Sequence, residues 1–184
     1  NTKALANYAH SEGYGCQATN TSAHAEGYNT AATGFFSHSS NRNTLASATC
    51  AHAEGEGTQA TADASHSEGF YTVASGFSGH AEGYETLASG YASSAGGYYT
   101  VASQPYQTVV GKYNAEALPN TLFTIGNGTS VNDRSDAFSV DDMGNATLAG
   151  NLDFAGINLQ DTLANLNDRI TQLEALIETL IEVV

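Results

Sequence analysis

Small residues alternate with larger or polar ones along most of this chain, and the alternation repeats every fourteen residues. All the histidines follow that period without a slip, at His10, His24, His38, His52, His66 and His80. Each fourteen divides into two sevens of the form S/T/A-x-A-x-G-x-x, in which five alternating residues are closed by glycine. This pattern predicts a short strand and a tight turn, and two such halves form one coil of a solenoid.

Glycine excludes the coiled coil that a seven-residue period can also indicate. Gly69, Gly76, Gly83 and Gly90 recur in register, and each would destabilise a helix by about 1 kcal/mol relative to alanine. The positions of one parity are small throughout, because protein interiors are close-packed and a thin lumen between two sheets has no room for more. In the second strand of the coil this position is always alanine, at Ala18, Ala32, Ala46, Ala60, Ala74, Ala88 and Ala102.

The opposite parity of the second strand carries an apolar column. A lumen of alanine and serine buries little apolar area, at roughly 25 cal/mol per Å², so one stack of coils is weakly stabilised alone. We therefore expect the apolar column to pack against sister chains. Gln17 and Gln59 interrupt it, which indicates a tolerant interface rather than a deep core. The predicted interface residues of the array are Leu45, Val73, Leu87 and Val101.

The array resembles a known family over about residues 9 to 104. Its S-x-A-x-G-x-x-T-x-A-x-G pattern is similar to the YadA-like heads of trimeric adhesins, and its HAEG variety resembles repeats in tail-fibre proteins of phages and prophages. The resemblance implies a mainly β fold, a left-handed parallel β-roll of fourteen-residue coils in a homotrimer. It does not specify a ligand. We assign residues 1–104 to the roll.

Residues 105–154 are expected to form a small β-rich transition module. Pro105 stands where a turn residue is expected, and because proline cannot donate to a strand ladder we expect the array to stop there. Beyond it, strand-like alternation recurs in TVVGKYN, TLFTIGNG, AFSVDD and NATLAG. The string from Leu122 to Gly150 resembles the segment that follows such rolls in phage tail proteins. It does not resemble the neck of bacterial trimeric autotransporters.

Residues 155–184 follow a heptad pattern with apolar residues at every a and d position from Leu159 to Val184. Isoleucine at a with leucine at d would favour two strands. Against that, the run RITQLE resembles a short motif of three-stranded coiled coils, and it places Arg169 at g and Glu174 at the following e, the geometry of an interchain pair. We therefore predict a trimeric coiled coil whose interface comprises Leu163, Leu166, Arg169, Ile170, Leu173, Glu174, Ile177 and Leu180.

The formal net charge of −14 argues against nucleic acid and anionic membranes as partners. No apolar run is long enough to span a bilayer, so we expect no membrane insertion. Cys16 and Cys50 lie more than two coils apart, beyond the roughly 7 Å limit for bridging, and we expect both to be unpaired. The chain starts within about one repeat of the array and has no signal peptide, as expected of a piece of a longer fibre.

In most of the coils that carry a histidine, a glutamate follows it two residues later. These glutamates are Glu12, Glu26, Glu54, Glu68 and Glu82. The simplest interpretation is structural, because stacked glutamates repel and interleaved histidines relieve the repulsion. A metal or anion ring, and a response between about pH 7 and pH 5, are alternative hypotheses. The sequence has no GxSxG, HExxH or phosphate-loop motif, although its many carboxylates leave a glycosidase-like pair open. We predict no enzyme, no catalytic residue, no cofactor and no bound metal.

Aromatic residues recur in both turn columns of the array. Such ladders stabilise a solenoid edge, and they also offer an aromatic strip to a glycan or protein receptor on a host cell. The candidate receptor contacts are Phe70, Tyr84 and Tyr98 in one column and Phe77 and Tyr91 in the other. Together with these columns, the resemblance to tail-fibre repeats implies a structural and adhesive segment of a trimeric phage or prophage tail fibre in the virion tail. The alternative is a head-stalk fragment of a trimeric autotransporter-type adhesin on the bacterial surface.

Overall fold

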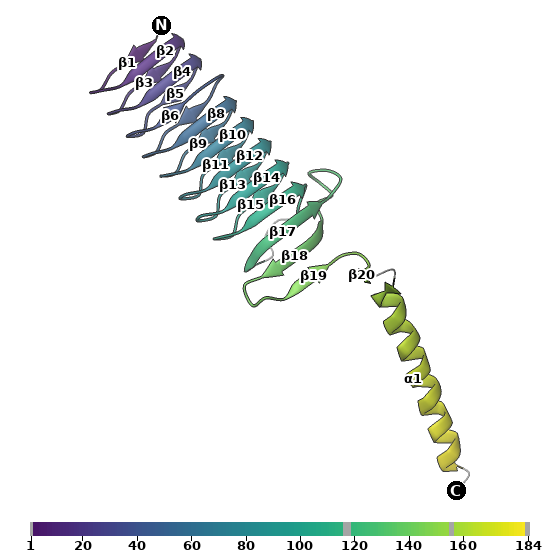
Figure 1. Ribbon diagram of the computed structural model, residues 1–184. Coiled ribbons are helices and arrows are strands. Elements are labelled where there is room, and N and C mark those ends of the chain that lie inside the picture. The colour runs from purple at the N-terminus through teal and green to yellow at the C-terminus, as the bar shows by residue number, and fades with distance from the viewer. Residues whose placement is uncertain (1, 116–118, 155–156, 183–184) are drawn as a thin grey trace. The chain divides into compact units, whose positions relative to one another are not determined.

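The computed structural model describes residues 2–115, 119–154 and 157–182. The chain forms two compact units, Asn1–Thr147 and Leu148–Val184. In the first unit the chain passes back and forth between two sheets and adds one strand to each sheet in every coil of the repeat (Figure 1). Corresponding residues of successive coils pair in parallel register, fourteen residues apart. The parallel β-solenoid predicted from the repeat is confirmed.

The first sheet consists of two-residue strands, because the turns on either side take up the rest of each half-coil. Among the described residues it has 8 strands in the order β1 (Lys3–Ala4), β3 (Gln17–Ala18), β5 (Ala31–Ala32), β7 (Leu45–Ala46), β9 (Gln59–Ala60), β11 (Val73–Ala74), β13 (Leu87–Ala88) and β15 (Val101–Ala102).

The second sheet carries the histidines and extends beyond the repeat array. Its 11 described strands run in the order β2 (His10–Tyr14), β4 (His24–Tyr28), β6 (His38–Ser39), β8 (His52–Glu56), β10 (His66–Phe70), β12 (His80–Tyr84), β14 (Ser94–Tyr98), β16 (Thr108–Lys112), β17 (Thr121–Asn127), β18 (Asp136–Asp141) and β19 (Ala146–Leu148).

Small side chains fill the space between the two sheets, as the sequence predicts. The alanines of the second strand are fully buried from Ala18 to Ala102, and so are those of the histidine-bearing strand, such as Ala25 and Ala81. A column of threonines also lies in the lumen. Two of these threonines pair with a serine five residues earlier: Ser39 Oγ lies 2.7 Å from Thr44 Oγ1, and Ser67 Oγ lies 2.8 Å from Thr72 Oγ1. The core is therefore partly polar, and its hydroxyls need partners inside it.

The roll does not end at Pro105, so that prediction is wrong. Strand β16 pairs in parallel with β14, and β17 pairs in parallel with β16. Pro105 fits because it lies in a turn rather than in the ladder: the Gln107 N–H donates to the Gln104 carbonyl oxygen at 3.3 Å, and Tyr106 has a φ of 62°. Proline followed by a residue of positive φ suits a type II turn, and the proline nitrogen is not required as a donor there.

The first unit ends with a further coil of the roll followed by an antiparallel pair of strands. Val109 takes the lumenal place of alanine in β16 and is fully buried. Strand β18 then reverses direction and pairs antiparallel with β17, with a register shift, and β19 follows it at the sheet edge. The strands predicted between residues 108 and 150 are thus present, but the first two extend the roll itself.

The second unit contains the hairpin of β20 (Asp153–Phe154) and β21 (Ile157–Asn158) and a single helix, α1 (Leu159–Glu182). Asn158 caps the helix, because its Oδ1 accepts a hydrogen bond from the Asp161 N–H at 3.1 Å. Asp161 adds negative charge in the first turn, which favours the helix dipole. Val184, predicted at an a position, lies outside the described residues. No helix in the described parts of the chain is long and apolar enough to cross a membrane.

Candidate functional site

The histidines and glutamates of the second sheet form one continuous feature, which we call the His–Glu ladder. It comprises His10, Glu12, His24, Glu26, His38, His52, Glu54, His66, Glu68, His80 and Glu82. In-register pairing places each histidine beside the next, with ring centroids 4.7–5.0 Å apart. Histidine and glutamate two residues apart in a strand share a face, so the ladder presents both groups together.

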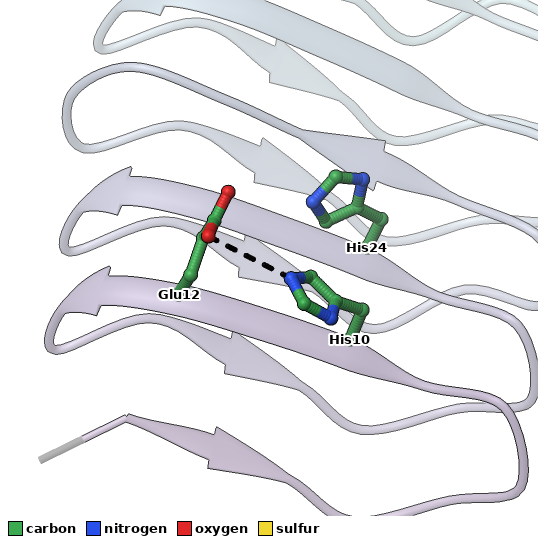
Figure 2. A group of neighbouring side chains, drawn as sticks. All are labelled: His10, Glu12 and His24. Carbon is green, nitrogen blue, oxygen red and sulfur yellow. Dashed lines mark ion pairs between the residues drawn. The ribbon is translucent and has the colours of Figure 1, made fainter.

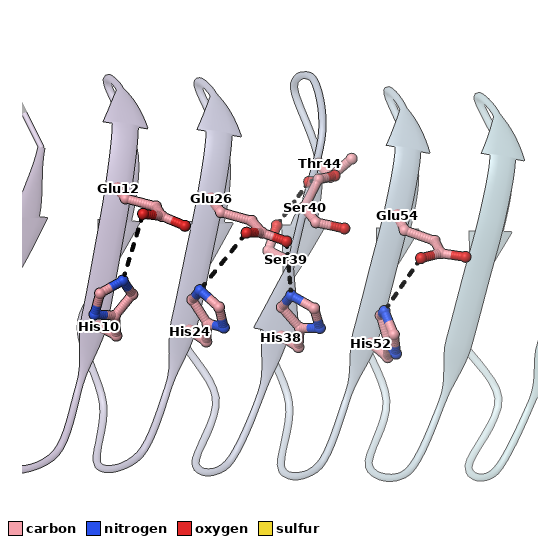
Figure 3. Close-up of polar contacts among 10 residues, drawn as sticks. All are labelled: His10, Glu12, His24, Glu26, His38, Ser39, Ser40, Thr44, His52 and Glu54. Atoms are coloured by element: carbon pink, nitrogen blue, oxygen red, sulfur yellow. Dashed lines mark hydrogen bonds and ion pairs between the residues drawn. The ribbon is translucent and has the colours of Figure 1, made fainter.

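Imidazole and carboxylate alternate along the ladder at a characteristic separation. The Nε2 atom of His52 lies 3.6 Å from a carboxylate oxygen of Glu54, and that of His80 lies 3.7 Å from one of Glu68. All such distances among the described residues fall between 3.6 and 3.9 Å. Figure 2 shows the pair of His10 and Glu12, and Figure 3 shows the pairs of His10, His24, His38 and His52 along the strands. The distances exceed the 2.7–3.2 Å of an N–H···O hydrogen bond. The groups therefore lie beside one another without being hydrogen-bonded.

The third coil interrupts the ladder. Ser40 stands where the other coils have glutamate, and strand β6 is shortened to His38–Ser39. Among the described residues, His38 therefore has only the Glu26 carboxylate of the preceding coil beside it, at 3.6 Å (Figure 3). Arg42 replaces the aromatic residue of this coil and pairs with Glu56 at 3.1 Å. The interruption divides the ladder into an N-terminal part and a longer central part.

Stacking in the central part disfavours protonation of one histidine. Burial lowers the pKa of His52 below its ordinary value, and the neighbouring His66 lowers it further, while Glu54 and Glu68 oppose both effects. A charged imidazolium would lie against another imidazole ring whose centroid is 4.7 Å away. His52 is therefore kept neutral to lower pH than an isolated histidine, and a neutral imidazole can bind a metal ion.

The predicted aromatic columns are stacked ladders along both turn edges of the roll. Phe70, Tyr84 and Tyr98 stack in sequence, with centroids 5.0 and 4.9 Å apart. On the other edge, Phe77 and Tyr91 stack at 5.2 Å with their planes 6° apart. The structure therefore brings together each set of candidate receptor contacts, and it keeps the two sets on separate edges.

A second aromatic row lies beside the first and was missed from the sequence. Tyr99 and Tyr113 stack at 5.1 Å, and Tyr99 also contacts Tyr98 edge-on at 4.8 Å. A hydrogen bond to the Glu85 carboxylate is the largest of the effects that raise the pKa of Tyr99 well above its ordinary value. The signal was present in the aromatic doublets Phe70–Tyr71 and Tyr98–Tyr99. We call Phe70, Tyr71, Tyr84, Tyr98, Tyr99 and Tyr113 the aromatic edge.

Stacking limits what the aromatic edge can bind. A sugar that packs on an aromatic ring needs a free ring face, whereas Tyr84 has Phe70 on one face and Tyr98 on the other. Tyr98 and Tyr71 remain 43% and 50% exposed. A receptor would therefore meet ring edges and phenolic hydroxyls rather than open faces, which suits a hydrogen-bonding partner.

The predicted interface residues of the roll lie in one column, which Gln59 interrupts. Val73 pairs in register with Leu87, and Leu87 with Val101, while Gln59 separates them from Leu45. All four apolar side chains are partly exposed in the single chain. Cys16 is buried and Cys50 exposed, and both are free, as predicted.

The predicted interface residues of the helix are exposed. The apolar side chains from Leu159 to Ile181 are 44–71% exposed. The described chain packs nothing over this face.

Comparison with family models, curated proteins and solved structures found no match to this chain. The interpretation of its surfaces therefore rests on their own geometry.

Proposed function

We propose that this chain is a segment of a homotrimeric fibre from the tail of a phage or prophage, and that it takes part in attachment to the host cell. In this proposal the roll is a left-handed YadA-like head, α1 is a strand of a trimeric coiled coil, and the fibre acts by binding rather than by catalysis. Its partners are sister chains and a host receptor, a glycan or a protein.

The exposed apolar face of α1 carries the proposal. A helix of 24 residues with leucine or isoleucine at each described a and d position leaves those side chains 44–71% exposed in the single chain. Water-exposed leucine and isoleucine at that spacing are stabilised when matching helices cover them. Arg169 at g and Glu174 at the following e supply charges of opposite sign at the edges of that face.

The roll supports the same assembly independently. Its fully buried side chains are alanine, serine, threonine, cysteine and a few somewhat larger ones such as Val109 and Asn114, so it buries little apolar area per residue. The column of Val73, Leu87 and Val101 adds larger apolar groups on the outer side of the first sheet. Covering that column with a sister chain adds the burial that the lumen lacks.

Attachment is assigned to the two aromatic ladders because they are the recurrent exposed aromatic groups of the roll. The test compares binding of fluorescent full-length chain to a panel of bacterial strains, after sedimentation has established an assembly of three 19.1 kDa chains, about 57 kDa. On a strain that binds, Tyr84→Ala with Tyr98→Ala should reduce binding at least tenfold. The phenolic groups lost are the hydrogen-bonding groups that the stack presents.

A matched pair in the same turn column provides the control. Tyr14 and Tyr28 stack at 5.2 Å in the N-terminal coils, apart from the aromatic edge. Replacing both by alanine should leave binding within twofold, although it removes two stacked tyrosines from the same turn column. Undiminished binding of the Tyr84 and Tyr98 variant would remove the aromatic edge from the attachment surface. An export signal and membrane anchor in the full-length gene would instead favour the bacterial surface adhesin.

A further inference from the structure

We propose that the His–Glu ladder binds zinc ions at two places on each chain, a function beyond fibre assembly and attachment. Three groups of side chains place one ligand atom each within 4.8 Å of one another. The first is His10, Glu12 and His24 (Figure 2). The other two share a glutamate: Glu54, His66 and Glu68, then Glu68, His80 and Glu82.

The donor atoms suit zinc rather than a hard cation. Imidazole nitrogen and carboxylate oxygen are both common zinc ligands, and three protein ligands with an open fourth position are a frequent arrangement. Calcium and magnesium prefer oxygen ligands alone. A group with two imidazoles and one carboxylate, as at His10, Glu12 and His24, therefore favours a first-row transition metal.

The separations along the ladder match a shared metal better than a direct contact. Two ligand atoms about 2.1 Å from a tetrahedral zinc lie roughly 3.4 Å apart. Within the proposed groups, the Nε2–carboxylate distances are 3.8 Å for His10 with Glu12 and 3.7 and 3.8 Å for His80 with Glu68 and Glu82. They are close to that value and too long for hydrogen bonds. Small side-chain rotations bring the groups onto one ion, and the backbone ladder holds the strands in register while they do so.

A second observation points to a missing partner within two of the three groups. The Nε2 atoms of His24 and His66, which belong to the first and second groups, are buried and make no hydrogen bond among the described residues, although both side chains remain partly exposed. The Nε2 atoms of His38 and His52, which belong to none of the groups, are in the same state. Buried polar atoms are nearly always paired. An ion seated between imidazole and carboxylate would pair them, and the partly exposed side chains leave it a path of entry.

The shared glutamate fixes the expected stoichiometry. Glu68 belongs to both central groups, so an ion in one group withdraws a ligand from the other. The central part of the ladder should therefore hold one ion, and the N-terminal group a second. Because each group joins adjacent coils, such as β8 to β10 or β10 to β12, a bound ion should also stabilise the roll.

The experiment titrates untagged full-length protein with Zn²⁺ by calorimetry after removal of metals by a chelator, and repeats the titration with Mg²⁺. Wild type should bind two Zn²⁺ per chain, and its Tm should rise with Zn²⁺ but not with Mg²⁺. Glu68→Gln should bind one, because both central groups lose a ligand. Glu26→Gln is the matched control, since Glu26 lies in the same column but in none of the three groups, and it should still bind two.

Three results would overturn the proposal. Absence of saturable Zn²⁺ binding by the wild-type protein would exclude the site. Equal losses in Glu26→Gln and Glu68→Gln, with both variants folded by circular dichroism, would show that the ladder attracts ions only through its overall charge. Equal binding of Mg²⁺ and Zn²⁺ would show that carboxylates alone are responsible. None of these results bears on whether the chain is a trimeric fibre.

Discussion

The two units of this molecule differ in how far the apolar side chains of their repeated positions are buried within the single chain. In the roll, alanine columns such as Ala74 and Ala88 are completely buried between the two sheets of the same chain. In α1, Leu173 and Leu180 are 58% and 71% exposed. The roll is built from small residues that its own coils cover, whereas the helix is built from large residues that its own chain does not cover.

This difference determines what each unit tolerates. A close-packed lumen lined by alanine, serine, threonine and glycine has little space for extra atoms, so the roll should be sensitive to added groups. The exposed helix face has space in the single chain, so α1 should be sensitive to changes that prevent another chain from covering it. Substitutions of opposite kinds therefore separate folding of the roll from assembly of the fibre.

The largest effect is expected from charge on the helix face. Leu166→Asp with Leu173→Asp places carboxylates at two successive d positions. Each affected layer should lose at least the roughly 2–5 kcal/mol that a buried leucine loses on truncation. We expect the wild-type assembly of about three 19.1 kDa chains to dissociate in sedimentation velocity.

A control of the same chemistry lies on the opposite side of the helix. Ala175 occupies an f position, away from the a and d stripe, and Ala175→Asp adds the same charge without entering the predicted interface. This variant should sediment as the wild type does. If it dissociates as fully as the double variant, or if the wild type is a folded monomer, the comparison between the two units fails.

The next largest effect is expected from one added methyl group in the roll. Gly83 has a φ of +104°, and a Cβ there would lie 2.2 Å from the carbonyl oxygen of Gly97 in the next coil. Alanine at this position would therefore bear strain of about 1–3 kcal/mol from its backbone conformation. Its Cβ would in addition clash with the next coil. Gly83→Ala should lower the Tm of the roll severely or prevent folding.

Gly144 provides the matched control for that substitution. Its φ is +81°, but a Cβ there would meet nothing within 4 Å. Gly144→Ala should therefore cost only the conformational strain, and a thermal melt followed by circular dichroism should show a much smaller loss. Similar losses in the two variants would mean that contact between coils is not what selects glycine at residue 83.

Features repeated in every coil could be predicted from the sequence, because the period determines which residues become neighbours. The histidine column, the alanine lumen and the two aromatic ladders are of this kind. The position of Pro105 was misinterpreted because proline excludes only a ladder donor, and residue 105 lies in a turn. Whether a residue falls in the ladder or in the turn depends on backbone geometry that the repeat pattern does not specify.

Features that depend on side-chain distance could not be predicted. The sequence showed histidine and glutamate on one face, but not that Nε2 and carboxylate would be 3.6–3.9 Å apart. It also did not show that serine and threonine five residues apart would meet across the lumen. Ser39 pairs with Thr44 at 2.7 Å, whereas the hydroxyl of Thr86, which has Ala81 at the serine position, has no hydrogen-bond partner in the described part of the chain.

The smallest predicted effect concerns the hydroxyl of Thr86, and it tests whether the lumen can accept one added oxygen atom. Ala81→Ser places a hydroxyl where Ser67 has one in the preceding coil, five residues before its own threonine. A hydrogen bond to Thr86 should stabilise the roll by about 1 kcal/mol, a rise in Tm of roughly 2–4 °C. Thr86→Val removes the partner, so the double variant should lose this gain if the hydrogen bond is its cause. A lower Tm for Ala81→Ser would mean instead that one oxygen atom already overfills the lumen, and that lumenal size outweighs hydrogen bonding in the choice between alanine and serine.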